Sequence, residues 1–245
     1  MSARWSLAAI VFLGLVRSAL ADPFINGPSQ GQQTNDMAVC AGQTRPPVSN
    51  QTSVEACTRL INTGSWSGRV IALHNRCALF TKIGEGERAI SDCDEAIRLN
   101  PDFVSAYNNR GAAYVVLGAE ERAVQDYDRA LRLDPNNAAA HHGRCYSLAV
   151  IGRAAEALVS CDRSLQLQPN DANALDSHGY AHLRLGLWAQ AERDYDAAIA
   201  ADATRAMSWF ARAVVRAHRG DQAGAQADLA VHGVYGLAST PTRHD

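Results

Sequence analysis

The sequence predicts an all-α protein, built as a solenoid of antiparallel helix pairs. Three observations predict this fold class. Residues of one type recur at intervals of 34 positions, which is typical of a repeat architecture. Between the recurring positions, apolar residues follow one another at three- and four-residue steps, as they do on one face of a helix. Glycine and proline alternate at the points where these helices would end.

Four columns of residues carry the 34-residue period. The glycine column holds Gly84, Gly118, Gly152, Gly186 and Gly220. The proline column holds Pro101, Pro135 and Pro169, with Ala203 at the next position. Alanine recurs at Ala89, Ala123, Ala157, Ala191 and Ala225, and a column of small residues holds Cys77, Gly111, Cys145, Gly179 and Ala213. Such agreement between columns predicts five structural units of one kind.

Each unit reads as helix, glycine turn, helix, proline turn. In the stretch "AEERAVQDYDRALRLDP", Ala123, Tyr127 and Ala130 share one helical face. Asparagine or aspartate follows the prolines, as in Pro135-Asn136-Asn137, and can cap the next helix. The central glycine suits the left-handed conformation that ends a helix.

This pattern resembles the tetratricopeptide repeat (TPR) family, most clearly in "AYNNRGAAYVVLGAEERAVQDYDRALRLDP" at residues 106–135. The resemblance covers roughly residues 70–233 and implies a right-handed α-solenoid. The expected units are 70–103, 104–137, 138–171, 172–205 and a degenerate 206–233. The last unit departs from the pattern, because Ala203 replaces the proline before it and His232 stands in its small-residue column. We expect this unit to act as a solvent-facing cap.

The segments that flank the repeats have other compositions. Residues 1–21 read as a secretory signal peptide, with Arg4 before an apolar run and the small-residue sequence "ALA" before Asp22. Residues 22–50 are rich in Gly, Pro, Gln and Asn, which predicts a linker. Residues 51–69 are expected to form a capping helix and loop, with Thr52 and Glu55 as its capping box. Residues 234–245 form a tail.

The architecture implied by the resemblance also pairs the cysteines. Its two helices run antiparallel around the glycine, so Cys77 faces Cys93 and Cys145 faces Cys161. Facing Cα atoms at such a helix contact lie at a distance that suits a disulfide. Cys40 and Cys57 remain as a third pair, which would tie the linker to the first helix. In an exported protein we expect three disulfides, and the alternative is six reduced, buried cysteines.

Two histidines invite a metal-site interpretation. His178 and His182 lie four residues apart on one helical face, as zinc ligands can. However, Gly179 stands where a zinc protease has glutamate, and these columns hold Arg110 and Tyr114 in the second unit. With no third ligand placed by the repeat, we expect packed histidines, no metal and no cofactor.

Aspartates recur as Asp-x-Asp, for example at Asp92 and Asp94 or Asp126 and Asp128. Residues two apart on a helix point in different directions and cannot share one cation. A column of arginines, Arg76, Arg110, Arg144 and Arg212, favours ion pairs between helices instead.

Charge and motifs exclude several classes of function. The net charge is −2, and the chain contains one lysine and no basic block of the kind that nucleic-acid or membrane-surface binding uses. No nucleophile elbow, Ser-His-Asp order or phosphate-binding glycine loop is present. We therefore expect no enzyme, no nucleic-acid partner and no transmembrane segment after signal cleavage.

The resemblance implies a concave groove lined by the first helix of each unit. The columns expected to face it are mostly polar or aromatic and hold His74, Asn75, Asn108, Asn109, His142, Tyr146, Asp176, Ser177, Tyr180 and Phe210. None of these is Lys or Arg, which argues against the carboxylate clamp that some TPR proteins use. Asparagine and tyrosine suit an extended peptide, bonded along its backbone with apolar contacts at the rings. The alternative is an ordinary solvated surface.

The sequence thus predicts an exported TPR protein that binds proteins or peptides in the bacterial cell envelope, in the periplasm or outside the cell. Its role would be that of a scaffold or assembly factor. A binding protein for a non-protein envelope ligand, such as a glycan or a metal, is the alternative, and an accessory subunit of an envelope enzyme is a third. The partner itself does not follow from the repeat columns, because they encode the scaffold.

Overall fold

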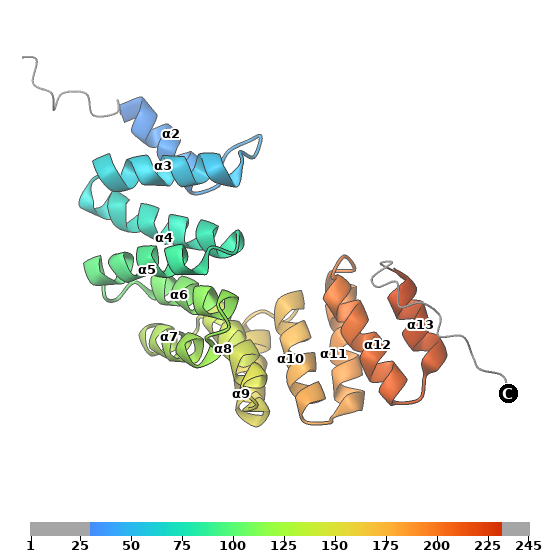
Figure 1. The fold of residues 1–245 in the computed structure, drawn as a ribbon. Coiled ribbons are helices and arrows are strands. Elements are labelled where there is room, and N and C mark those ends of the chain that lie inside the picture. The colour runs from blue at the N-terminus through green and yellow to red at the C-terminus, as the bar shows by residue number, and fades with distance from the viewer. Residues whose placement is uncertain (1–29, 232–245) are drawn as a thin grey trace, which may run out of the picture. The chain divides into compact units, whose positions relative to one another are not determined.

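A computed structural model describes residues 30–231. These residues form twelve helices and no strands, so the all-α prediction is confirmed (Figure 1). The helices are α2 (Gln30–Cys40), α3 (Asn50–Thr63), α4 (Trp66–Lys82), α5 (Gly86–Leu99), α6 (Val104–Val116), α7 (Glu120–Leu133), α8 (Ala138–Val150), α9 (Ala154–Leu167), α10 (Ala172–Arg184), α11 (Trp188–Ala201), α12 (Ala206–His218) and α13 (Gln222–Val231). None of them is long and apolar enough to cross a membrane. The expected signal peptide, tail and His232 lie outside the described residues.

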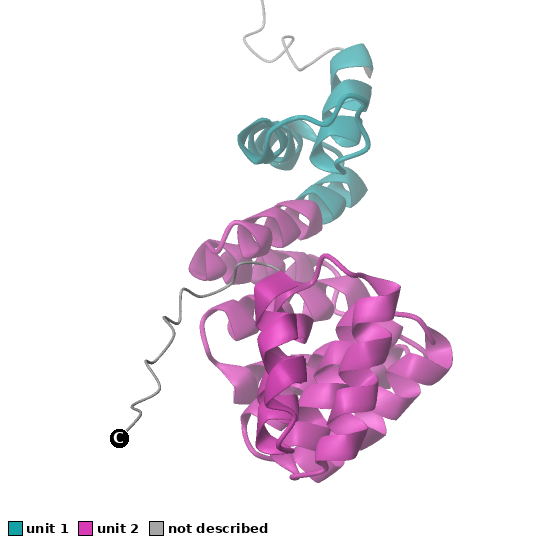
Figure 2. Cartoon of the chain, turned by 90° about the vertical axis from the view of Figure 1, so that its right-hand side faces the viewer, with its two compact units in different colours: residues 1–72 teal, residues 73–245 magenta. Residues whose placement is uncertain are grey.

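The chain divides into two compact units, residues 1–72 and residues 73–245 (Figure 2). In the first, α2 and α3 are joined by the Cys40–Cys57 disulfide and by an ion pair. The Arg59 guanidinium donates two hydrogen bonds, of 3.0 and 2.7 Å, to the carboxylate of Asp36, which is 1% exposed. Hydrogen bonding to Arg59 also lowers the pKa of Asp36.

Three features of helices α2 to α4 differ from the sequence-based expectation. Helix α2 occupies part of the expected linker, because its contacts with α3 outweigh a composition that is poor in helix formers. Helix α3 is capped by Ser49, whose Oγ accepts a hydrogen bond of 3.1 Å from the Thr52 amide, so Thr52 is inside the helix instead of at its cap. Helix α4 also begins at Trp66, before the expected start of the repeats.

The second unit consists of successive helix pairs. Each pair turns at the predicted glycine, whose φ is positive in every case, from 69° at Gly118 to 90° at Gly220. A side chain would strain this conformation, which explains the glycine column. After two of the prolines the predicted caps form, since Asn137 accepts a hydrogen bond from Ala140 and Asp171 accepts one from Asn173.

Small residues allow the helices of a pair to approach closely. The alanine column is fully buried at Ala123, Ala157 and Ala191. Around Ala123, Tyr107, Tyr114 and Tyr127 form one core cluster. The Tyr127 ring lies against two glycines, because a Cβ added at Gly111 would come within 2.8 Å of it and one added at Gly143 would come closer still. The two glycines, on α6 and α8, therefore leave the space that the Tyr127 ring of α7 occupies.

Two of the three disulfides join the pairs that the repeat predicts, and the third joins Cys40 and Cys57, the pair that remained. Cys77–Cys93 links α4 to α5 and Cys145–Cys161 links α8 to α9, with Cα atoms 5.7 and 5.2 Å apart. All four sulfurs belong to residues with no exposed surface. In the unit between them, Gly111 faces Tyr127 instead, so the same contact is filled by a ring.

Arginines of the first helices bond to aspartates on both sides of them. Within one repeat, Arg110 on α6 donates hydrogen bonds of 2.7 and 2.6 Å to Asp126 on α7. Across to the preceding repeat, it reaches Asp94 on α5 at 2.5 Å. Hydrogen bonding to Asp126, together with Asp94, raises the pKa of Arg110. The two aspartates of an Asp-x-Asp pair thus serve different arginines, as the sequence indicates.

The same arrangement recurs along the chain, and we call it the arginine ladder. It consists of Arg76 with Asp92, Arg110 with Asp94 and Asp126, Arg144 with Asp128, and Arg212 with Asp196 and Asp228. Arg144 completes its own repeat through Ser160 instead of an aspartate, at 2.7 Å. Because Arg110, Arg144 and Arg212 each contact the preceding repeat as well as their own, the ladder fixes how one helix pair packs on the next.

Removing one rung should destabilise the second unit. For Arg110→Ala we expect the free energy of unfolding to fall by about 2–4 kcal/mol, because the mostly buried Asp126 carboxylate loses its partner. Arg98→Ala is the matched control, since its pair with Glu95 is exposed, and it should leave stability unchanged. Chemical denaturation followed by circular dichroism measures both. Equal stability of the two variants would contradict a structural role for the ladder.

Replacing Cys77 and Cys93 together by alanine should lower the free energy of unfolding by about 3 kcal/mol, because the disulfide closes a short loop in the unfolded chain. Denaturation of the variant and the wild type under non-reducing conditions measures the difference. Thiol titration of the unfolded wild-type protein provides the control. Six free thiols in that titration would refute all three bonds.

Candidate functional site

A groove of about 540 Å³ lies along the first helices of the second unit. Its walls come mainly from α6, α8 and α10, with Thr81 of α4 and Arg205, which precedes α12, at its margins. Six of the ten expected groove residues line it: Asn108, Asn109, His142, Tyr146, Asp176 and Ser177. Tyr127 and Gly143 form part of its floor. The sequence therefore identified the main helices of this groove.

The remaining expected residues lie in different places. His74 contacts the groove through Asn109, whose Nδ2 lies 3.0 Å from His74 Nδ1. Tyr180 adjoins Tyr146, with ring centroids 6.3 Å apart. Asn75 and Phe210 are half-buried and are not among the residues that line the groove.

Several polar groups of the groove bond to a neighbouring helix. His142 Nε2 lies 3.0 Å from Ser177 Oγ, and Ser208 donates a hydrogen bond of 2.5 Å to Asp176. Asn108 donates one of 3.0 Å to Asn137. These side chains thus hold successive first helices together. The sequence predicts them only as ligand contacts and does not reveal this structural role.

Two buried atoms of the groove have no hydrogen-bond partner among residues 30–231. One is the acceptor Asn108 Oδ1 and the other is the donor Arg205 Nε. The opposite side of the Arg205 guanidinium donates a hydrogen bond of 2.7 Å to Asn173, which fixes its position. Because unpaired buried polar atoms are costly, each of the two marks a position in the groove where a ligand could supply the missing partner.

Arg205 is the functional candidate that the sequence analysis missed. It stands in the turn where Asn137 and Asp171 cap the earlier helices, and only the helical columns were considered for the groove. Arg205 lies 34 residues after Asp171, so extending the column of capping residues by one repeat identifies it. The groove therefore does contain an arginine, although none of the ten residues expected to line it is Lys or Arg.

Burial sets the charge of His142 in the groove and of His74 beside it. Desolvation lowers the pKa of His74 and of His142, so both rings are neutral near pH 7. Neutral imidazole both donates and accepts hydrogen bonds. The middle of the groove is thus an uncharged surface, with Asp176 and Arg205 at one end.

A second hollow, of about 660 Å³, lies among α7, α8 and α9. Its lining is strongly charged and includes Asp128, Arg144, Asp162 and Arg163. Arg144 forms an ion pair with Asp128, and Arg163 donates a hydrogen bond to the Asn136 amide oxygen, so both guanidinium groups already have partners. The first groove combines exposed aromatic surface with an unpaired donor and acceptor, and we take it as the candidate site.

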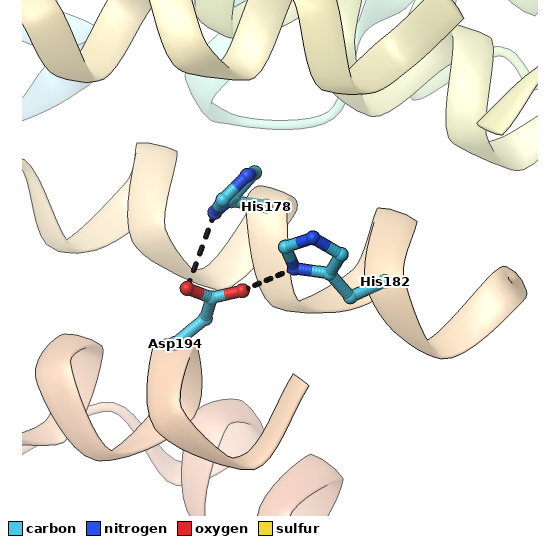
Figure 3. A group of neighbouring side chains, drawn as sticks. All are labelled: His178, His182 and Asp194. Carbon is cyan, nitrogen blue, oxygen red and sulfur yellow. Dashed lines mark hydrogen bonds and ion pairs between the residues drawn. The ribbon is translucent and has the colours of Figure 1, made fainter. Parts of the chain in front are cut away.

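His178 and His182 of α10 meet Asp194 of α11 (Figure 3). Nitrogen and oxygen atoms of the three residues lie within 4.8 Å of one another. His182 Nδ1 is 2.6 Å from one carboxylate oxygen, and His178 Nδ1 is 3.2 Å from the other. The expectation that the repeat places no third ligand near the histidines is therefore wrong. Asp194 belongs to the column of Asp92 and Asp126, which faces the arginine column across each helix pair.

Comparison with family models finds two matches, both described as tetratricopeptide repeat. One covers residues 104–137, and the other covers residues 121–172 and 177–231. Together they span about half of the chain. A comparison with curated proteins found no match.

Solved structures of similar fold include YrrB, a TPR protein with an unusual peptide-binding site, at 24% identity and a TM-score of 0.54. That match covers 72% of this chain and 90% of YrrB. A tetratricopeptide repeat protein from Parabacteroides merdae gives 18% identity and a TM-score of 0.62, over 82% of this chain and 78% of its own. A thermophilic TPR protein of Thermus thermophilus gives 18% identity and a TM-score of 0.62, and that match covers 75% of this chain and 98% of the other. At these identities the structures share the fold.

The floor of the groove depends on the fit of Tyr127 against Gly143. Gly143→Ala should lower the free energy of unfolding by about 1–3 kcal/mol, because the added methyl group overlaps the ring. In a Tyr127→Leu background the same substitution should cost less, since the ring is gone. A double-mutant cycle in denaturant measures the coupling. Additive effects of the two substitutions would show that the contact does not limit packing.

Proposed function

Because the chain belongs to the tetratricopeptide repeat family, we propose that its groove binds an extended peptide segment of a partner protein. The family is generally non-catalytic. The groove does hold a serine hydroxyl 3.0 Å from an imidazole nitrogen, between Ser177 and His142, but Ser177 is buried and this contact joins two successive first helices. A binding role therefore accounts for the site better than a reaction does.

The observation that carries the proposal is the pair of buried atoms without partners. Asn108 Oδ1 requires a donor and Arg205 Nε requires an acceptor. An extended peptide backbone offers an N–H and a C=O at every residue, so it can satisfy both. YrrB, which shares the fold, is a TPR protein with an unusual peptide-binding site, and this supports the same kind of ligand here.

The aromatic side chains suggest where a peptide side chain would bind. Tyr146 is 39% exposed in the groove and lies beside Tyr180, so the two rings present apolar surface with hydroxyl groups at the edge. Arg184 donates a hydrogen bond of 3.1 Å to the Tyr180 hydroxyl, which holds that ring. An apolar side chain of the ligand would pack on these rings, and a carboxylate would favour the end near Arg205.

For the setting, we propose an exported scaffold or assembly factor of the bacterial cell envelope. Three disulfides among fully or nearly buried cysteines support an oxidising compartment. The apolar run at residues 5–16 supports export. A glycan could also stack on the tyrosines, so it is an alternative ligand for the same groove.

The test is a screen of protein from Asp22 to Asp245 against an array of random peptides, followed by calorimetry with the best binder. Tyr146→Ala should weaken the affinity at least about tenfold, because exposed aromatic residues in grooves contribute strongly to binding. Arg205→Ala should reduce the affinity for peptides that contain an acidic residue more than the affinity for neutral peptides.

The matched control is Val159→Ala, which removes an apolar side chain that is 69% exposed and does not line the groove. It should leave the affinity unchanged. If no peptide binds and cell-wall glycan fragments do bind, the ligand of the groove is a glycan and the peptide proposal is wrong. Equal losses in the Tyr146 and Val159 variants would place the binding surface elsewhere.

A further inference from the structure

The fourth repeat interrupts the arginine ladder with two histidines. His178 stands where the other repeats have Arg76, Arg110, Arg144 and Arg212. It also keeps the same two neighbours, since it lies near Asp194 of its own repeat and near Asp162 of the preceding one. His182 stands one turn further along α10, where other repeats have Phe80, Tyr114, Leu148 and Arg216.

The substitution changes the charge around Asp194. In the other repeats that have an aspartate in this column, a guanidinium with a permanent positive charge bonds to it. Within residues 30–231, no Lys or Arg pairs with Asp194, and both of its oxygens face imidazole nitrogens. Imidazole has no permanent charge. A carboxylate with little exposed surface, 17% for its side chain, therefore lacks a fixed cation.

The orientation of the rings suits a metal ion. His178 Nδ1 is buried and, although it lies 3.2 Å from Asp194, makes no hydrogen bond of acceptable geometry with the described residues. Its other nitrogen, Nε2, lies 3.5 Å from Asp162. Because Nδ1 has no hydrogen-bond acceptor of suitable geometry among the described residues, the carboxylate beside Nε2 favours the proton on Nε2, and the Nδ1 lone pair then points toward Asp194 and His182. Metal-binding histidines commonly have such a carboxylate at the opposite ring nitrogen.

We propose that His178, His182 and Asp194 bind one divalent transition-metal ion of the zinc type. Two imidazole nitrogens and a carboxylate oxygen form a ligand set that zinc accepts, with bonds of about 2.0–2.2 Å. Ligand atoms in a tetrahedral zinc site lie about 3.4 Å apart. The three atoms lie within 4.8 Å of one another, so small side-chain rotations suffice to enclose the ion. Asp162 does not bind the ion itself but positions the His178 ring, through its contact with Nε2.

The bound ion would take the place of the arginine that the fourth repeat lacks. It would neutralise Asp194 and hold α10 against α11, which is the contact that Arg110 and Asp126 make in the second repeat. A protonated imidazole could neutralise Asp194 without a metal, and this is the competing explanation. The proposal does not rest on peptide binding in the groove, because none of these residues lines it.

The experiment is equilibrium dialysis of metal-free protein from Asp22 to Asp245 against zinc chloride, with thermal unfolding as the second readout. The wild type should bind one equivalent of zinc and unfold at a higher temperature when zinc is present. His182→Ala should lose this equivalent. Asp162→Asn should weaken binding about 10–100-fold without abolishing it, as expected when the residue orients a ligand.

His178→Arg is the decisive variant, because it restores the residue of the other repeats. It should fold and be at least as stable as the metal-free wild type, yet bind no zinc and show no zinc-dependent rise in unfolding temperature. His141→Ala is the control, since this half-buried histidine of α8 lies outside the cluster.

Absence of a bound equivalent in the wild type would overturn the proposal in favour of a protonated imidazole. Retention of the equivalent in both His178→Arg and His182→Ala would overturn it as well, because the ion would then bind elsewhere. Loss of zinc by His141→Ala would have the same meaning.

Discussion

The packing of the helix pairs depends on ion pairs between arginines and aspartates that lie 16 residues apart in either direction. Arg110 shows the principle, because one guanidinium bonds to Asp126 within its own repeat and to Asp94 in the preceding one. Alanine and glycine columns let helices approach one another, but apolar contacts have no preferred direction. Paired guanidinium hydrogen bonds do have one, and they fix both the register within a helix pair and the packing of successive pairs.

The repeat made most of this predictable from the sequence. A residue such as Gly118 acts locally, through a turn that only glycine adopts easily, so a column of glycines locates every turn. The cysteine pairs followed because each lies across the same turn. Helix α2 was not predictable in this way, since Asp36 and Cys40 stabilise it through α3, and no column shows such contacts.

The candidate groove shows how scaffold and binding surface share residues. His142 and Ser177 were identified from their columns as ligand contacts, and the structure shows them bonded to each other across two helices. Arg205 escaped prediction because it belongs to a turn, where residue type varies between repeats. Columns thus predict which side chains face a surface, whereas the bonds that those side chains already make become visible only in three dimensions.

The replacement of an arginine by His178 lengthens one contact between neighbouring repeats. Between other repeats a guanidinium reaches the preceding aspartate at 2.5–2.7 Å, whereas His178 lies 3.5 Å from Asp162. In a repeat array, cooperativity depends on the coupling between neighbours. The ladder therefore contributes less to the coupling at the α9–α10 junction than at the junctions that a guanidinium bridges, and the His142–Ser177 contact between α8 and α10 carries part of that coupling. The coupling between neighbouring repeats thus varies along the array with the residue at one position of the first helix.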